Sequence, residues 1–133
     1  MNGETDLARL LGGMRPFLHE EPVVFCVVRP DEVTCLPFEP IGVFREDEGT
    51  TVIAPAEEAR KAGFACSGLW AHITLQVHSP LEAVGLIAAV AGALARRSIS
   101  VNPVAAFHHD HLFVPWEKKE EAMGVLIEME SAE

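Results

Sequence analysis

Hydrophobic and polar residues alternate strictly between residues 69 and 78, which is typical of a strand with one buried face. Its apolar positions are Leu69, Ala71, Ile73, Leu75 and Val77. Residues 83–95 contain no charged side chain, and their bulky residues recur at helical spacing. Because Ser79 and Glu82 have the spacing of a capping box and Pro80 suits a first helical turn, we predict a helix that begins at this turn and runs to about Arg97.

Shorter apolar runs and helix signals predict further elements on both sides of this segment. Thr5 or Asp6 can cap a short N-terminal helix. The proline-rich stretch from Pro30 to Pro40 indicates an irregular connection. The remaining predicted elements are a strand covered on both faces over 23–28, hairpins over 41–54 and 104–114, and helices over 55–62 and 117–129.

The predicted elements of the second half have the order β-α-β-β-α. A ferredoxin-like β-α-β-β-α-β unit needs one more strand, and we expect the 23–28 strand to fill that place. The sequence therefore predicts an α+β protein with antiparallel sheets.

Composition narrows the classes of partner. The 133 residues carry a formal net charge of -10, which repels phosphate backbones and anionic lipid headgroups, so we expect neither nucleic acid nor a membrane as a partner. The uncharged stretch over 83–95 is shorter than the roughly 20 residues of a membrane span. Hydrophobic residues make up 49% of so acidic a chain, which indicates apolar surface buried between subunits.

The cysteines and the N-terminal sequence indicate in which cellular compartment we expect the protein. Cys26, Cys35 and Cys66 are odd in number, and no two have a C-x-x-C spacing, so the sequence indicates neither a disulfide framework nor a zinc knuckle. The N-terminus has no basic segment followed by an apolar run, which argues against a signal peptide. We therefore expect reduced thiols and a cytoplasmic protein.

The turn from Ser79 to Gly85 is the candidate ligand site. A helix start exposes N–H groups and a partial positive charge, which suit a small carboxylate. Gly85 has no side chain to obstruct a ligand, Asn102 could present an amide from the next strand, and Glu82 could accept an α-amino group. The alternative is that Ser79 and Glu82 only cap their own helix and that no ligand binds.

A second cluster has the residue types of a metal site. His109 and His111 are two positions apart, so on a strand they would point to one face with Asp110 between them. Imidazole and carboxylate suit zinc, nickel or iron. The alternative is that a hairpin turn simply tolerates Asp and His, and we expect no metal or other cofactor. The further candidate ligands are His108, His72 and His78.

Three segments together resemble an ACT domain: Leu75–Leu86, Ala93–Asn102 and His111–Pro115. The resemblance extends back through Phe44–Gly49 and Thr51–Ile53. The whole chain is similar to small stand-alone bacterial ACT proteins of unknown function, in which two ACT-like halves occur in tandem. The resemblance implies two ferredoxin-like βαββαβ halves, which we place over residues 1–65 and 66–133.

The resemblance also implies a site and an assembly. ACT domains bind amino acids at the turn between their first strand and first helix, and they pair across subunits. In this sequence the expected ligand-binding residues are His78, Ser79, Leu81, Glu82, Ala83, Val84 and Gly85, together with Asn102.

Three functional hypotheses follow. The first is a cytoplasmic homodimer that binds a small, amino-acid-like ligand as a regulatory protein without catalytic activity. The second is a structural or partner-binding dimerisation module, whose contact surface is the stripe of small residues formed by Gly85, Ala88, Ala89 and Gly92. The third is a metal-dependent enzyme that uses His109 and His111.

Overall fold

The alternating segment forms strand β5 (Cys66–Leu75), and the second half of its apolar face is buried. Ala71, Ile73 and Leu75 are fully buried, whereas Leu69 is 42% exposed. The computed structural model describes residues 6–133, so Thr5, one of the two predicted cap residues, lies outside the described part. Asp6 does cap helix α1 (Leu7–Gly12), because its side chain accepts a hydrogen bond from the Arg9 N–H at 3.1 Å.

The chain forms two compact units, and β5 contributes residues to both. Unit 2 is Glu21–Trp70, and unit 1 combines residues 6–20 with Ala71–Glu133. The first half of β5 therefore belongs to unit 2 and its second half to unit 1. The predicted division at residue 65 stays a prediction.

Unit 2 has the element order β-α-β-β-α-β, and all its strand pairs are antiparallel. Its sheet has the order β3-β4-β2-β5, so the first and third strands of the unit lie in the middle. The buried side chains are Val24, Cys26, Val28, Val52, Ala54 and Ala59. Apart from β5, its elements are β2 (Val23–Val28), α2 (Pro30–Val33), β3 (Gly42–Glu46), β4 (Gly49–Pro55) and α3 (Ala56–Ala62).

Two of the predictions for unit 2 are confirmed and two are wrong. The hairpin and the helix after it form as predicted, and the helix ends at Gly63, whose φ of 75° favours glycine. Strand β2 is not covered on both faces, because Val27 is 66% exposed. The proline-rich connection is not wholly irregular either. Pro30 begins the short helix α2, where the Glu32 carboxylate accepts a hydrogen bond from the Arg29 N–H at 2.8 Å.

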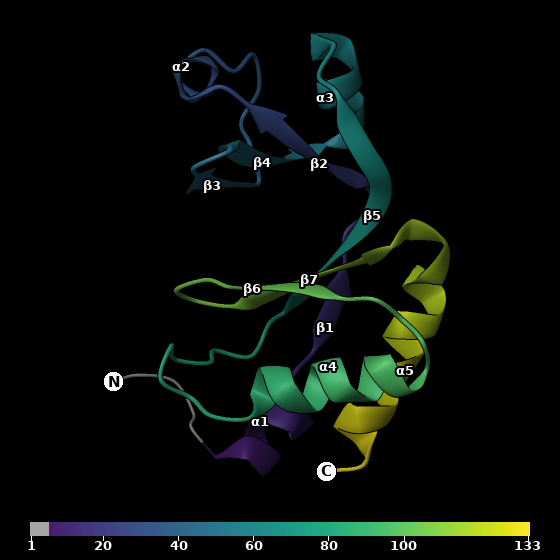
Figure 1. The fold of residues 1–133 in the computed structure, drawn as a ribbon. Helices are drawn as coiled ribbons and strands as arrows, with labels where there is room; N and C mark the ends of the chain where they lie inside the picture. Colours follow the sequence, from purple (N-terminus) through teal and green to yellow (C-terminus); the bar gives the residue numbers. More distant parts are fainter. Residues whose placement is uncertain (1–5) are drawn as a thin grey trace. The chain divides into compact units, whose positions relative to one another are not determined.

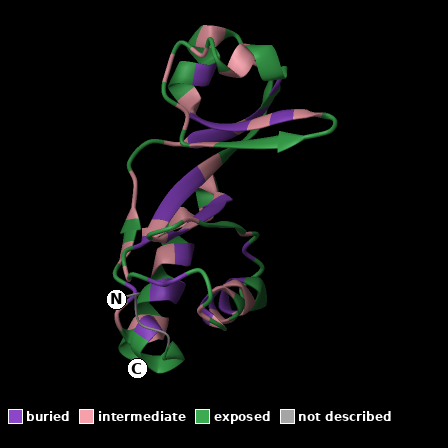
Figure 2. Cartoon of the chain, turned by 90° about the vertical axis from the view of Figure 1, so that its left-hand side faces the viewer, coloured by how far each residue is buried: buried purple, intermediate pink, exposed green. Residues whose placement is uncertain are grey.

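Unit 1 has the sheet order β1-β5-β7-β6, and helices α4 and α5 lie on the same side of it (Figure 1). The core of unit 1 lies between this sheet and the helices. It includes Leu10, Ile73, Leu94 and Leu126, and Figure 2 marks the buried positions along the strands and the inner sides of the helices. Its remaining elements are β1 (Pro16–Leu18), α4 (Leu86–Arg96), β6 (Asn102–Ala105), β7 (Asp110–Pro115), the 3₁₀ turn η1 (Trp116–Lys118) and α5 (Lys119–Ser131).

The missing strand of the second half comes from the N-terminal segment. Strand β1 pairs antiparallel with β5, with Pro16 opposite Leu75 and Leu18 opposite Ile73. The expectation that residues 23–28 would fill this place is wrong, since that strand belongs to unit 2. A strand of three residues is too short for periodicity to predict it.

The predicted α+β, ferredoxin-like fold with antiparallel sheets is confirmed, and so are the second hairpin and the C-terminal helix. Among residues 6–133, no helix is both long enough and apolar enough to span a bilayer.

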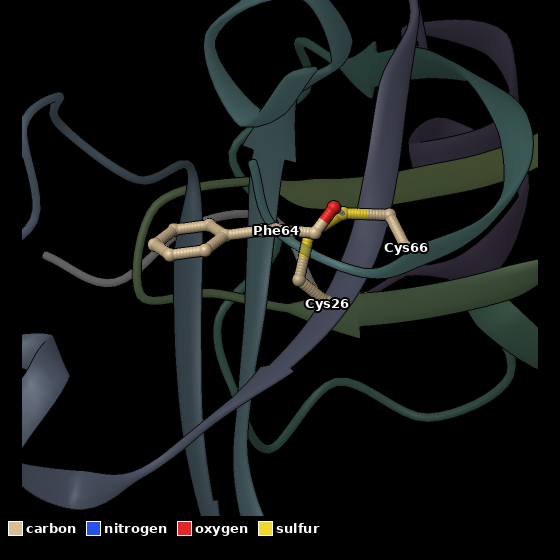
Figure 3. The surroundings of a disulfide bond; sticks show 3 residues. All are labelled: Cys26, Phe64 and Cys66. Carbon is tan, nitrogen blue, oxygen red and sulfur yellow. Dashed lines mark hydrogen bonds between the residues drawn. A yellow bond between two sulfur atoms is a disulfide. The ribbon is translucent and has the colours of Figure 1, made fainter. Parts of the chain in front are cut away.

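A disulfide joins Cys26 of β2 to Cys66 of β5 (Figure 3). The two residues are directly opposite each other in the strand pairing, and their Cα atoms are 4.5 Å apart. The Cys66 Sγ also lies 3.5 Å from the Phe64 carbonyl oxygen, a contact without donation because a disulfide sulfur carries no hydrogen. The expectation of reduced thiols is therefore wrong for these two residues. Cys35 is free and exposed.

We expect the disulfide to stabilise unit 2 substantially. It bridges a sequence separation of 40 residues, for which loop-closure entropy alone gives about 4 kcal/mol. In urea unfolding monitored by circular dichroism, Cys66→Ala should lower the free energy of unfolding by roughly 2–4 kcal/mol. Cys35→Ser is the matched control and should change it little. Dithiothreitol should destabilise the wild type but not Cys66→Ala. An equal response of both proteins to the reductant would contradict the bond.

Candidate functional site

The turn after β5 has a different structure from the one predicted. Helix α4 begins at Leu86, with Gly85 as its N-cap, so Ser79 and Glu82 do not form a capping box. Residues 76–85 are instead an irregular loop, in which the Ala83 N–H donates to the Pro80 carbonyl at 3.0 Å. Gly85 has a φ of 100°, a conformation that other residues rarely adopt, and it turns the chain into the helix.

A pocket of unit 1 lies where this loop, the start of α4 and the β6–β7 hairpin meet. Its volume accessible to the centres of water molecules is about 110 Å³. Eight of its ten lining residues have no polar side-chain atom. The lining residues are Ser79, Pro80, Leu81, Ala83, Gly85, Leu86, Ile87, Ala88, Ala105 and Asp110.

Ser79 and Asp110 are the polar side chains of this lining, and both are more than nine-tenths buried. Their exposed fractions are 7% and 6%. Within the described part of the chain, neither side chain forms a hydrogen bond or an ion pair with another residue. No described side-chain N or O atom is both sealed from solvent and without a partner. The carboxylate oxygens of Asp110 are therefore not sealed from solvent. Since Asp110 lines the pocket, we infer that they are accessible from it.

The environment of Asp110 disfavours its charge. Burial raises the pKa of the carboxyl above its ordinary value, and the neighbouring His109 opposes this rise. A buried carboxylate that lacks donors loses the hydrogen bonds that water would give it. An ammonium group in the pocket would donate hydrogen bonds to it.

The start of α4 offers the opposite charge. Leu86, Ile87 and Ala88 are the first residues of the helix and line the pocket. The first N–H groups of an α-helix have no partner within the helix, and no side chain caps α4. Their partial positive charge suits an anion. The pocket therefore combines an anion-binding wall with a buried carboxylate, which suits a small molecule that carries both charges.

The structure brings together only part of the predicted site. Ser79, Leu81, Ala83 and Gly85 line the pocket. The side chains of the other four predicted residues are exposed and do not contribute to the lining, namely His78, Glu82, Val84 and Asn102.

From the sequence, Asp110 was a candidate ligand of a metal site, and its place in the lining of this pocket was not predicted. The sequence also suggested Glu82 as the acceptor for an α-amino group, whereas Asp110 is the carboxylate in the lining. The predicted topology could have revealed this position of Asp110, because a βαββαβ unit places its hairpin beside the turn that follows the first strand. Asp110 is the first residue of β7 and pairs with Ala105 across that hairpin.

Three histidines meet around Thr74 elsewhere in unit 1. The nitrogens His72 Nε2 and His111 Nδ1 are 3.0 Å apart, so one ring donates a hydrogen bond to the other. His19 Nε2 lies 2.8 Å from the Thr74 hydroxyl, and His111 Nδ1 lies 3.2 Å from it. The His19 ring also stacks on His72, with centroids 4.0 Å apart.

The pKa values of these histidines are lowered, mainly by burial. Burial, followed by the charges of His19 and His111, lowers the pKa of His72 to about 3. Burial also lowers the pKa of His19, and burial, His109 and His19 lower that of His111.

The candidate metal ligands His109 and His111 have separate contacts. His109 Nδ1 donates to the Val77 carbonyl at 3.4 Å, whereas His111 contacts His72. Across residues 6–133, no group of three or more His, Cys, Asp or Glu side chains has an arrangement that could hold a metal ion.

Two family models match the chain in tandem. A model described as an ACT domain matches residues 2–70, and a second model with the same description matches residues 70–128. No curated protein matches the chain.

Solved structures are similar over nearly the whole length. A protein of unknown function from Vibrio cholerae, described as a possible transport protein, is 47% identical with a TM-score of 0.79, over 88% of this chain and 89% of that one. A protein from Agrobacterium tumefaciens is 15% identical with a TM-score of 0.71, over 86% and 87%. The regulatory subunit of aspartate kinase from Thermus thermophilus is 10% identical with a TM-score of 0.67, over 86% and 95%. The last two similarities concern the fold alone.

We expect acid to destabilise the protein through His72. Its pKa in the folded state is about 3, against 6.5 for a free side chain, so the unfolded chain binds this proton first as the pH falls. The contribution to stability is complete above pH 6.5 and falls by up to about 1.4 kcal/mol per pH unit towards pH 3. Urea unfolding between pH 4 and 8 measures this slope, and His72→Gln should reduce it. An identical slope in both proteins would contradict the assignment.

Proposed function

We propose a regulatory, ligand-binding function, starting from the fact that the chain belongs to the ACT domain family. ACT domains are typically regulatory modules that bind small ligands. We propose that this one binds a small amino acid in the pocket beside Ser79 and has no catalytic activity of its own. The observation that carries the proposal is that the buried carboxylate of Asp110 and the uncapped start of α4 line the same pocket.

The two ends of an amino acid match the two charged features of the pocket. An α-carboxylate can accept hydrogen bonds from the first N–H groups of α4. An α-ammonium can donate to Asp110, whose carboxylate has no partner among the described residues. Hydrogen bonds between charged groups are roughly twice as strong as neutral ones, and those to a buried group relieve its desolvation as well. A free amino acid therefore complements the pocket better than a simple carboxylic acid or amine.

The polar lining supports binding rather than catalysis. Nucleophilic catalysis needs a nucleophile beside a base that a third group orients. In the lining, the only hydroxyl is that of Ser79 and the only titratable side chain is that of Asp110. The apolar remainder is typical of a site that excludes water and positions a ligand.

The proposal includes a homodimer in the cytoplasm. Val84 and Phe107 of unit 1 are 81% and 70% exposed, and apolar surface of this kind favours contact with a second copy. Light scattering after size exclusion should give twice the mass of the chain. Because disulfides are uncommon in cytoplasmic proteins, the location needs its own test. Cell fractionation would show the compartment of the protein. Alkylation of free thiols after acid quenching would show whether Cys66 is oxidised there.

We expect Asp110→Asn to abolish binding of amino acids without harming the fold. The amide cannot balance an ammonium, so titration calorimetry with a mixture of the standard amino acids should lose its heat. The free protein should become more stable, because an uncompensated buried charge is removed. The melting temperature should rise by about 3–5 °C for each kcal/mol gained in the free energy of unfolding.

Asp47→Asn is the matched control, because Asp47 is an exposed residue of the β3–β4 turn in unit 2. It should leave both binding and the melting temperature of the free protein nearly unchanged. Binding of amino acids by Asp110→Asn with wild-type affinity would refute the assignment of Asp110. If no amino acid produces heat with the wild type, the proposed function itself is wrong.

A further inference from the structure

The pocket restricts which amino acid it can hold, an inference that rests on the proposed function. Asp110 and the start of α4 account for the two charges that all free amino acids share. The rest of the lining then faces the ligand's side chain. Its side chains are apolar except for that of Ser79, and no second charged residue is present in it.

The volume sets an upper limit on size. A water molecule needs roughly 10–15 Å³ of the space that its centre can occupy. A pocket of about 110 Å³ therefore holds on the order of seven to eleven water-sized groups. Glycine to leucine fall within this limit, since they have about five to nine non-hydrogen atoms, whereas phenylalanine, arginine and tryptophan exceed it.

The walls that set this limit belong to the core. Leu86 is only 2% exposed and packs among the core residues of unit 1, and Pro80 is buried. Enlarging the pocket on this side would open a packed interior, which proteins resist. Leu81 limits the pocket on its exposed side, since it lines the pocket and is 63% exposed.

The charges set a second limit. An acidic side chain would place a second carboxylate in a small pocket with Asp110, in a protein whose formal net charge is already -10. A basic side chain would add a cation without a carboxylate of its own, since the α-ammonium occupies Asp110. Burying an unpaired charge is costly in either case.

We infer that the ligand is an α-amino acid with a short, uncharged side chain, in the range from glycine and alanine through serine and threonine to valine. The Ser79 hydroxyl, which has no partner among the described residues, provides a hydrogen bond to the ligand's carboxylate or to its hydroxyl group.

Calorimetric titration of the wild-type protein with single amino acids tests this inference. The probes are glycine, alanine, serine, threonine and valine against aspartate, lysine, phenylalanine and tryptophan. Some member of the first group should bind at least about tenfold more tightly than every member of the second. Tightest binding by a large or charged amino acid would overturn the inference while the proposed function stands. Absence of binding by all the standard amino acids would overturn both.

A variant pair tests the size limit directly. Leu81→Ala enlarges the pocket and should improve the binding of phenylalanine, which exceeds the size limit, relative to alanine by about tenfold. Ile127→Ala is the matched control, because Ile127 is a 50% exposed aliphatic residue of α5 outside the lining. It should leave this ratio unchanged. An unchanged ratio in Leu81→Ala, with alanine binding intact, would show that the wall does not limit the ligand and would overturn the inference.

Discussion

The backbone pairing of β5 is the interaction on which both units depend. In unit 2, its first half hydrogen-bonds to β2 and completes a four-stranded sheet. In unit 1, its second half lies between β1 and β7, and its buried side chains form the centre of the core. One continuous strand thus supplies the last strand of one ferredoxin-like unit and the first strand of the other. The alternating apolar residues of β5 are buried only in the part of the strand that belongs to unit 1, namely Ala71, Ile73 and Leu75.

Two sets of buried or half-buried polar groups in unit 1 have opposite roles. The histidines around Thr74 form hydrogen bonds of 2.8–3.2 Å with its hydroxyl and with one another, and burial lowers their pKa values. Such a satisfied network strengthens a fold. Asp110 has no such partner among the described residues, and burial raises the pKa of its carboxyl. A buried carboxyl that faces a pocket without a protein partner contributes little to stability, and such a group is typical of a binding site.

The small size of unit 2 explains the place of the disulfide. A unit of about 50 residues buries a limited core, which here consists mainly of short aliphatic side chains and the Cys26 sulfur. A covalent link between β2 and β5 adds stability that such a core supplies poorly. The link also fixes β5 to its own sheet at the end of the strand that is exposed, where side-chain burial contributes little.

The sequence by itself determined the longer strands, the hairpins, the C-terminal helix and the α+β class, because these follow from local periodicity and turn residues. It placed a turn at Ser79 but extended the following helix over Gly85. It did not determine that Cys26 lies opposite Cys66, that Pro16–Leu18 completes the sheet of unit 1, or that α4 begins only at Leu86. Each of these depends on contacts between distant residues, which local patterns do not encode. Asp110 is the clearest case, because its spacing suggested a metal ligand, and only the packing of the hairpin against the loop made it the carboxylate of a pocket.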